Sequence, residues 1–173
     1  GVSEQALRRF RFEAQVLGTL QHPGIAQIYE AGTFEDEYGE RPYYAMEFIA
    51  GAKPLTEYAR LNDLSLDDRL ELFERVCDAV HHGHQKGIIH RDLKPGNILA
   101  TYENGKPAIK VIDFGIAKAL NPTFGAGDHV TQEGRLIGTP EYMSPEQAQM
   151  SAIDVDTRSD VYSLGVLLYE LLA

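Results

Sequence analysis

Polar side chains that could do chemistry gather in two short stretches of this chain. The first is residues 90–97, HRDLKPGN, and the second is residues 113–115, DFG. Amide and carboxylate oxygens such as those of Asn97 and Asp113 suit a hard divalent cation, and Mg²⁺ completes its shell with water and phosphate oxygens. The pair therefore predicts a nucleotide site, on condition that the fold brings Asn97 and Asp113 together.

The segment between the two stretches predicts a β-hairpin that would bring them together. Apolar and β-prone residues fill both arms, and Asn104-Gly105 in the middle is a strong two-residue turn signal. With the turn there, Asn97 should face Ile112, so Asn97 and Asp113 would lie side by side at the open end. Opposed Cα atoms in such a pair lie roughly 4.5 to 5.5 Å apart. Both side chains could then bind one cation.

Asp92 and Lys94 lie on a loop that Pro95 and Gly96 keep from becoming helix. Asp92 would lie near the metal ion without having to bind it. This position suits a carboxylate that orients a hydroxyl and accepts its proton during phosphoryl transfer. Lys94 would supply a compact positive charge for the phosphoryl group. Any one of these residues alone would be an ordinary solvated loop residue, and only their combined spacing predicts this chemistry.

On these motifs the chain resembles the catalytic domain of the eukaryotic-like serine/threonine protein kinases, a family also found in bacteria. HRD, the asparagine that follows it and DFG are signatures of that family. The resemblance implies an α+β, protein-kinase-like fold that is truncated at both ends. Residues 1–49 would form a partial N-lobe with helix C, two or three strands and the start of the hinge. Residues 50–173 would form a partial, mainly helical C-lobe up to helix F.

The resemblance also assigns roles to single residues. Asp92, Lys94, Asn97 and Asp113 would be catalytic, and Asn97 and Asp113 would hold Mg²⁺ or Mn²⁺. The cofactors implied are therefore ATP and a divalent metal ion. The residues expected to bind or support the nucleotide are Glu13, Met46, Glu47, Ile49, Leu99 and Asp113.

Two extended segments, residues 24–33 and 42–49, are joined by an acidic loop, and the second resembles the kinase hinge. By that match Met46 is the gatekeeper, and the backbone of Glu47 and Ile49 would bind the adenine edge. The spacing alone fits an ordinary strand with a buried methionine equally well. Only the place of this segment in the order of motifs favours the hinge.

In the family, the residue that matches Glu13 pairs with a lysine that grips ATP. No lysine precedes Glu13 in this chain, and no Gly-x-Gly-x-x-Gly motif occurs in it. The isolated chain would therefore lack the roof of its nucleotide pocket. We expect these 173 residues to have little or no activity by themselves.

Residues 113–146 form a long segment with little periodicity, which corresponds by resemblance to the activation loop. Thr131 is the predicted phosphorylation site and Arg91 its expected partner, because a phosphate adds about −1.5 to −2 charge. An unmodified polar threonine fits the sequence equally well. The segment closes with GTPEYMSPE, in which Thr139 would hydrogen-bond near Asp92.

Four helices are predicted around these loops. Residues 3–20 are amphipathic, residues 54–61 could form a short helix, and residues 65–86 begin at an N-cap, Ser65. The helix that begins at Asp160 is apolar nearly all round, which is typical of a central buried helix, and by resemblance Asp160 would hold the catalytic-loop backbone. The stripe expected to be buried in the third helix is Leu66, Leu70, Phe73, Val76, Cys77 and Val80.

Three histidines, His81, His82 and His84, lie near the end of the predicted helix over residues 65–86 and invite comparison with a zinc site. Neighbouring positions on a helix point in different directions. No cysteine or carboxylate completes a set of ligands. The pattern therefore favours ordinary structural or surface histidines.

Composition and charge exclude several classes of partner. The 173 residues suit one domain, and their net charge of −10 argues against nucleic acid or an anionic membrane surface. The lone cysteine, Cys77, excludes an internal disulfide and agrees with a reducing compartment, so we expect a cytoplasmic domain. No run approaches the ~20 apolar residues that cross a bilayer, and any membrane anchor would lie outside this segment.

The resemblance implies a kinase that transfers the γ-phosphoryl group of ATP to serine or threonine hydroxyls of protein substrates. Lys94 is typical of serine/threonine enzymes, and dimerisation could serve autophosphorylation. A pseudokinase or phosphotransfer-dead binding module is the alternative, although Asp92, Asn97 and Asp113 are all present. A small-molecule phosphotransferase of related fold should lack Lys94 and the segment over residues 139–146.

Overall fold

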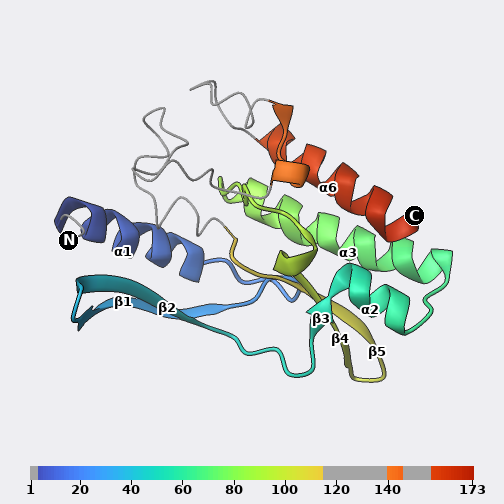
Figure 1. Ribbon diagram of the computed structural model, residues 1–173, viewed down its shortest axis with the longest axis horizontal. Helices are drawn as coiled ribbons and strands as arrows, with labels where there is room; N and C mark the ends of the chain where they lie inside the picture. The colour runs from blue at the N-terminus through green and yellow to red at the C-terminus, as the bar shows by residue number, and fades with distance from the viewer. Residues whose placement is uncertain (1–3, 115–139, 146–156) are drawn as a thin grey trace.

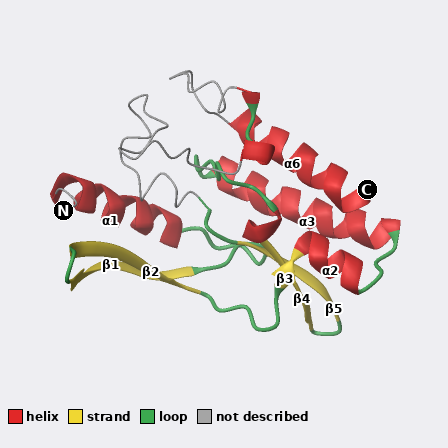
Figure 2. Cartoon of the chain, viewed as in Figure 1, coloured by secondary structure: helices red, strands yellow, loops and turns green. Residues whose placement is uncertain are grey.

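The computed structural model describes residues 4–114, 140–145 and 157–173. Helix α1 lies along the β1–β2 hairpin at one end of the molecule, while α2, α3 and α6 lie beside the second sheet at the other end (Figure 1). Figure 2 shows the same division by secondary structure. The elements are α1 (Glu4–Gly18), β1 (Ile28–Asp36), β2 (Gly39–Met46), β3 (Lys53–Pro54), α2 (Leu55–Leu61), α3 (Leu66–Gln85), η1 (Pro95–Asn97), β4 (Ile98–Glu103), β5 (Lys106–Val111), η3 (Pro140–Tyr142) and α6 (Thr157–Leu172).

The first sheet is the antiparallel pair β1–β2, covered by α1. The apolar positions predicted for α1 are buried, since Leu7, Phe10, Ala14 and Leu17 are all at most 6% exposed. The strands run further than predicted, into the acidic segment that we expected to be a loop. At this end of the hairpin, Oδ2 of Asp36 lies 2.9 Å from Nε of Arg41, so the charge of Asp36 is partly offset.

The second sheet has the order β3–β4–β5 and contains the predicted hairpin. Its register places Glu103 opposite Lys106, which centres the turn on Asn104-Gly105 as predicted. Both turn residues have positive φ, 51° at Asn104 and 80° at Gly105, which the turn types of tight hairpins require. The sequence did not predict β3, because a strand of two residues leaves no periodic signal.

A backbone bridge joins the two ends of the molecule. Ile25 forms a parallel bridge with Val111, in which the Val111 N–H donates to the Gly24 carbonyl at 2.7 Å and the Ala26 N–H donates to the Val111 carbonyl at 3.0 Å. The chain between α1 and β1 is therefore fixed to the end of β5. This places the start of the first sheet beside the residues that follow β5.

Helix α3 begins where predicted, with the side chain of Ser65 accepting a hydrogen bond from the Asp68 N–H. The predicted buried stripe is partly wrong, because Leu66 and Leu70 are 60% and 40% exposed. The helix carries two apolar faces. The face that packs against β5 and α6 is not the one that contains Leu66 and Leu70. The residues buried in α3 are Leu72, Val76, Ala79, Val80 and Gly83.

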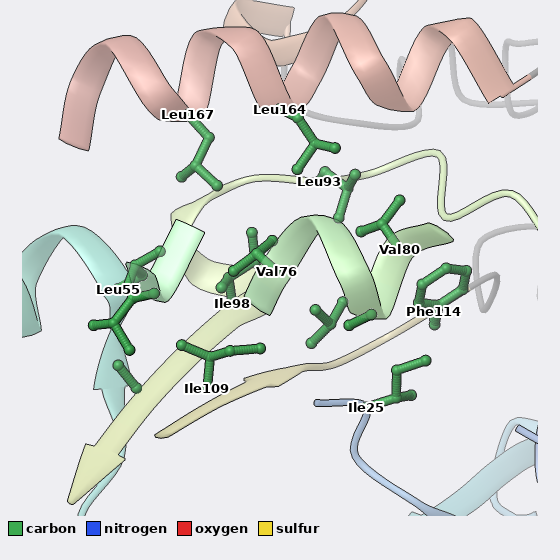
Figure 3. Close-up of a cluster of buried hydrophobic side chains, with 14 of the residues drawn as sticks. Ile25, Leu55, Val76, Val80, Leu93, Ile98, Ile109, Phe114, Leu164 and Leu167 are labelled. Atoms are coloured by element: carbon green, nitrogen blue, oxygen red, sulfur yellow. The ribbon is translucent and has the colours of Figure 1, made fainter. Parts of the chain in front are cut away.

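The main hydrophobic core lies between α3, the second sheet and α6, and reaches the chain around Ile25 (Figure 3). Leu93 and Leu167 are completely buried in it. Helix α6 buries one face within the described residues, whereas Val161 and Tyr169 are 60% and 74% exposed. The apolar pattern is typical of a central buried helix, but within the described part of the chain only one face of α6 is covered.

Within the described residues, every helix is too short or too polar to span a bilayer.

The N-cap of α3 gives a direct stability test. We expect Ser65→Ala to lower the free energy of unfolding by about 1 kcal/mol, because the Asp68 N–H loses its side-chain acceptor. Urea denaturation followed by circular dichroism measures this change. Ser65→Thr keeps a hydroxyl and should retain most of the stability, so an equal loss in both variants would contradict the capping role.

Candidate active site

The catalytic-loop candidates meet on a short loop that ends in the turn η1. The Nζ of Lys94 lies 3.4 Å from Oδ2 of Asp92. The side-chain amide of Asn97 donates to the Asp92 carbonyl at 2.8 Å and to Oδ2 at 3.3 Å. Leu93, between them, points into the core and is completely buried (Figure 3). The loop is therefore anchored by its apolar residue, while the polar side chains of Asp92 and Lys94 stay partly exposed and Asn97 is buried beside them.

The predicted neighbourhood of Asn97 and Asp113 follows from the hairpin register. The Ile112 N–H donates to the Asn97 carbonyl at 2.9 Å, so residue 97 does face residue 112 and Asp113 follows directly. Because the amide nitrogen of Asn97 is engaged by Asp92, its side-chain oxygen is the atom left to act as a ligand. An amide oxygen and a carboxylate from adjacent backbone positions are a donor set that fits Mg²⁺ or Mn²⁺.

His90 links the catalytic loop to the strand end that carries Asp113. Its Nε2 lies 2.8 Å from the Ile112 carbonyl, which can only accept, so Nε2 carries the proton. Its Nδ1 accepts from the Asp92 N–H at 3.1 Å. The ring is fully buried and packs edge-on against Phe114, with centroids 5.0 Å apart. The ring is thus held as the neutral tautomer, and it joins the catalytic loop to the residue that follows Asp113.

Asp160, at the start of α6, holds the backbone of the same loop. Its carboxylate accepts from the His90 N–H at 2.8 Å, from the Arg91 N–H at 2.9 Å and from Nε2 of His84 at 2.7 Å. Burial alone would raise the pKa of Asp160, but these hydrogen bonds outweigh it and the pKa is lowered. The role predicted for Asp160 by resemblance is confirmed.

The other histidines near the end of α3 serve different contacts. The ring of His82 lies 5.0 Å from that of His22, and Nε2 of His22 bonds Asp78 at 2.9 Å. Within the described ranges, no three histidine, cysteine or acidic side chains are placed to hold a metal ion. Cys77, on the same helix, is half-buried, and burial raises the pKa of its thiol.

The ring of Phe114 packs where Gly83 has no side chain. A Cβ added to Gly83 would lie 2.2 Å from the Phe114 ring, and Figure 3 shows the ring beside the end of α3 that carries Val80. This contact was not predicted, since a glycine inside a helical pattern gives no indication of its partner.

The predicted hinge residues lie along the connection from β2 to the second sheet. The Glu47 N–H donates to the Gln27 carbonyl at 2.8 Å, so only the Glu47 carbonyl remains as its backbone contact for an adenine. The carboxylate of Glu47 lies 3.0 Å from Nζ of Lys110. Burial would raise the pKa of Glu47, but the Gln27 N–H and Lys110 outweigh it and lower the pKa. Lys110 is a site neighbour that the sequence did not indicate.

Other nucleotide candidates surround this connection. Met46 lines a small apolar pocket together with Leu17, Asp113 and Phe114, so the predicted gatekeeper does lie beside the predicted metal ligand. The Ile49 carbonyl accepts from the Ala52 N–H at 3.4 Å. Leu99 is half-buried on β4, opposite Pro54.

Glu13 and Arg91 line the same hollow under α1. Burial lowers the pKa of Arg91, while the charges of Asp160 and Glu13 act in the opposite direction. Glu13 thus lies near Arg91, the catalytic-loop residue that we expect to pair with a phosphate on Thr131.

Thr131 and Thr139, the predicted regulatory threonines, lie outside the described residues. The end of their segment is described and docks on α6. The Ser163 hydroxyl donates to the Tyr142 carbonyl at 2.6 Å, the Tyr142 hydroxyl bonds Glu170, and Ser144 is completely buried.

The buried histidine predicts a pH dependence of stability. Burial lowers the pKa of His90, although Asp160, the Ile112 carbonyl, Asp92 and Asp113 act to raise it. Below the usual pKa of about 6.5, the unfolded chain binds a proton that the folded chain excludes, so stability falls as the pH drops through this window. We expect His90→Phe to flatten this part of the curve of unfolding free energy against pH.

Urea denaturation at pH values from 7.5 to 5.5 would measure this dependence. The matched control is His81→Gln, since His81 is exposed on α3 and should leave the slope unchanged. An unchanged slope in His90→Phe would contradict the assignment.

The chain matches the family model of the protein kinase domain over residues 2–173. It is 44% identical over 164 residues to the serine/threonine-protein kinase PknB of Mycolicibacterium smegmatis, and 40% identical over 169 residues to the serine/threonine-protein kinase Pkn1 of Myxococcus xanthus. These alignments cover 95% and 97% of this chain, but 25% and 23% of the relatives. The chain therefore spans about a quarter of their length.

A solved structure gives the same result. The crystal structure of the Mycobacterium tuberculosis PknI kinase domain matches with a TM-score of 0.69 and 28% identity, over 99% of this chain and 59% of that chain. By its motifs, its fold and its relatives, the chain belongs to the protein kinase domain family, among the bacterial serine/threonine kinases.

Proposed function

We propose that the protein containing this chain transfers the γ-phosphoryl group of ATP to serine or threonine hydroxyls of protein substrates. The observation that carries the proposal is the cluster of Asp92, Lys94 and Asn97 beside the strand end that leads to Asp113. These are the groups that a kinase needs to orient a hydroxyl, neutralise phosphate and hold a metal ion.

In the proposed mechanism, Asp92 orients the attacking hydroxyl and accepts its proton. The hydrogen bond from its own N–H to His90 fixes its backbone, and the Asn97 amide fixes its carboxylate. Lys94, 3.4 Å from that carboxylate, is placed to contact the phosphoryl group as it moves. A divalent metal held by Asn97 and Asp113 would neutralise the charge of the nucleotide phosphates.

The nucleotide base would lie against the connection after β2. The proposed contacts to the adenine edge are the Glu47 carbonyl and the backbone of Ile49. The side chains of Met46 and Leu99 would pack against the base. The Thr101 hydroxyl donates to the Ala50 carbonyl at 3.3 Å, which holds this connection against β4. The compartment of the protein, its dimerisation and the phosphorylation of Thr131 stay predictions.

Two substitutions in the longer protein that carries this chain test the proposal. We expect Asp92→Asn to lower kcat by on the order of 10²-fold or more, because the proton acceptor is lost. We expect Asp113→Asn to abolish both metal-dependent ATP binding and phosphoryl transfer. Transfer of labelled phosphate to a generic serine-containing substrate and to the protein itself measures the first change, and calorimetry with ATP and Mg²⁺ measures the second.

The control is Asp67→Asn, which removes one exposed carboxylate on α3 and should leave both measurements unchanged. ATP binding without any transfer in the unsubstituted protein would instead support a phosphotransfer-dead binding module.

We further propose that these 173 residues alone transfer little or no phosphate, because no lysine precedes Glu13 and no glycine-rich phosphate loop occurs among them. Transfer of labelled phosphate by the purified chain, compared with its Asp113→Asn variant, tests this. ATP-dependent transfer that disappears in the variant would contradict it.

A further inference from the structure

The hydroxyl of Tyr44, on β2, donates a hydrogen bond to Oδ1 of Asp113 at 2.5 Å. The two residues come from separate parts of the chain, and both side chains are partly buried. A hydrogen bond to an ionised carboxylate is about twice as strong as one between neutral groups. The proposed steps of phosphoryl transfer do not use this bond.

Asp113 needs such support because its backbone is strained. Its φ is +57°, in the left-handed region that residues other than glycine rarely adopt. Strain of this kind persists only where the surrounding structure fixes the residue from several sides. Before Asp113, Ile112 is fixed by Asn97 and His90. After it, Phe114 is fixed by the ring of His90.

The bond from Tyr44 fixes the remaining part of Asp113, which is its side chain. A carboxylate has two oxygens and about four acceptor positions, so a donor at Oδ1 leaves Oδ2 as a ligand. The body of Tyr44 lines the same apolar pocket as Met46, Leu17 and Ile28. The hydroxyl therefore reaches Asp113 from a rigid, packed side chain.

We propose that Tyr44 is a positioning residue for the metal site, and that its hydroxyl holds one oxygen of Asp113 so that the other faces the cation shared with Asn97. This inference rests on the proposed function. In this proposal Tyr44 acts through Asp113 and is not itself a ligand of the cation.

The test uses Tyr44→Phe in the longer protein that carries this chain, because this change removes the hydroxyl and keeps the packed ring. Electron paramagnetic resonance of free Mn²⁺, titrated in the presence of a non-hydrolysable ATP analogue, measures metal affinity without turnover. We expect the Mn²⁺ dissociation constant to rise by about three- to tenfold, as for the loss of one hydrogen bond net of water. In activity assays, the Mg²⁺ requirement should rise by the same factor, while kcat at saturating Mg²⁺ stays within about twofold of the parent.

The neighbouring tyrosine supplies a matched control. The hydroxyl of Tyr43 bonds Glu30 on the other face of the same hairpin, so Tyr43→Phe removes an identical group without reaching Asp113. It should leave the Mn²⁺ dissociation constant unchanged. Tyr44→Leu, with a different apolar side chain and no hydroxyl, should reproduce the rise, and thermal denaturation of each variant reports whether the fold is kept.

The results separate this inference from the proposed function. Loss of Mn²⁺ binding in Asp113→Asn together with unchanged binding in Tyr44→Phe would overturn only the role of Tyr44. Tighter binding in Tyr44→Phe would also overturn it, because the hydroxyl would then compete with the metal. Unchanged binding in Asp113→Asn would overturn the metal site itself and, with it, the proposed function.

Discussion

The structure of the site depends on a buried hydrogen-bond network around His90 and Asp160. Asp160 accepts from two successive backbone N–H groups of the catalytic loop, and His90 joins the Asp92 N–H to the Ile112 carbonyl. Both groups are at most 1% exposed, where a lost partner leaves an unsatisfied polar group at a cost of about 1 to 3 kcal/mol. The network therefore fixes the positions of Asp92 and of Ile112, the residue before Asp113, relative to α6 and to each other.

The second constraint is the attachment of the segment between α1 and β1 to the end of β5. Val111 exchanges hydrogen bonds with Gly24 and Ala26, one residue before the carbonyl that His90 binds. The β1–β2 hairpin that carries Met46 and Tyr44 thus begins beside the strand end that carries Asp113. This attachment brings Met46 and Tyr44, which are distant from Asp113 in sequence, into the lining of the same pocket as Asp113.

Much of this arrangement could be predicted from local sequence patterns. The turn at Asn104-Gly105 fixed the register of β4 and β5, because a side-chain period of two leaves no freedom once the turn is placed. The N-cap at Ser65 was predicted for a similar local reason. The buried face of α3 was not, because two apolar faces compete and only the packing partners decide between them. The contacts of Tyr44 and Gly83 were not predicted either, since each depends on a partner brought close by the tertiary fold.

Asp113 and Phe114 are adjacent in sequence but are held by different means. The buried ring of Phe114 packs edge-on against His90 and fills the space beside Gly83, so it is held by apolar contacts. Asp113 is held by directional hydrogen bonds at its neighbours and by Tyr44 at its side chain. The φ of +57° at Asp113 sets the direction in which its side chain leaves the backbone, and Tyr44 then holds the carboxylate. Because each residue is held by its own partners, a buried apolar anchor and the proposed metal ligand can occupy consecutive positions of the chain.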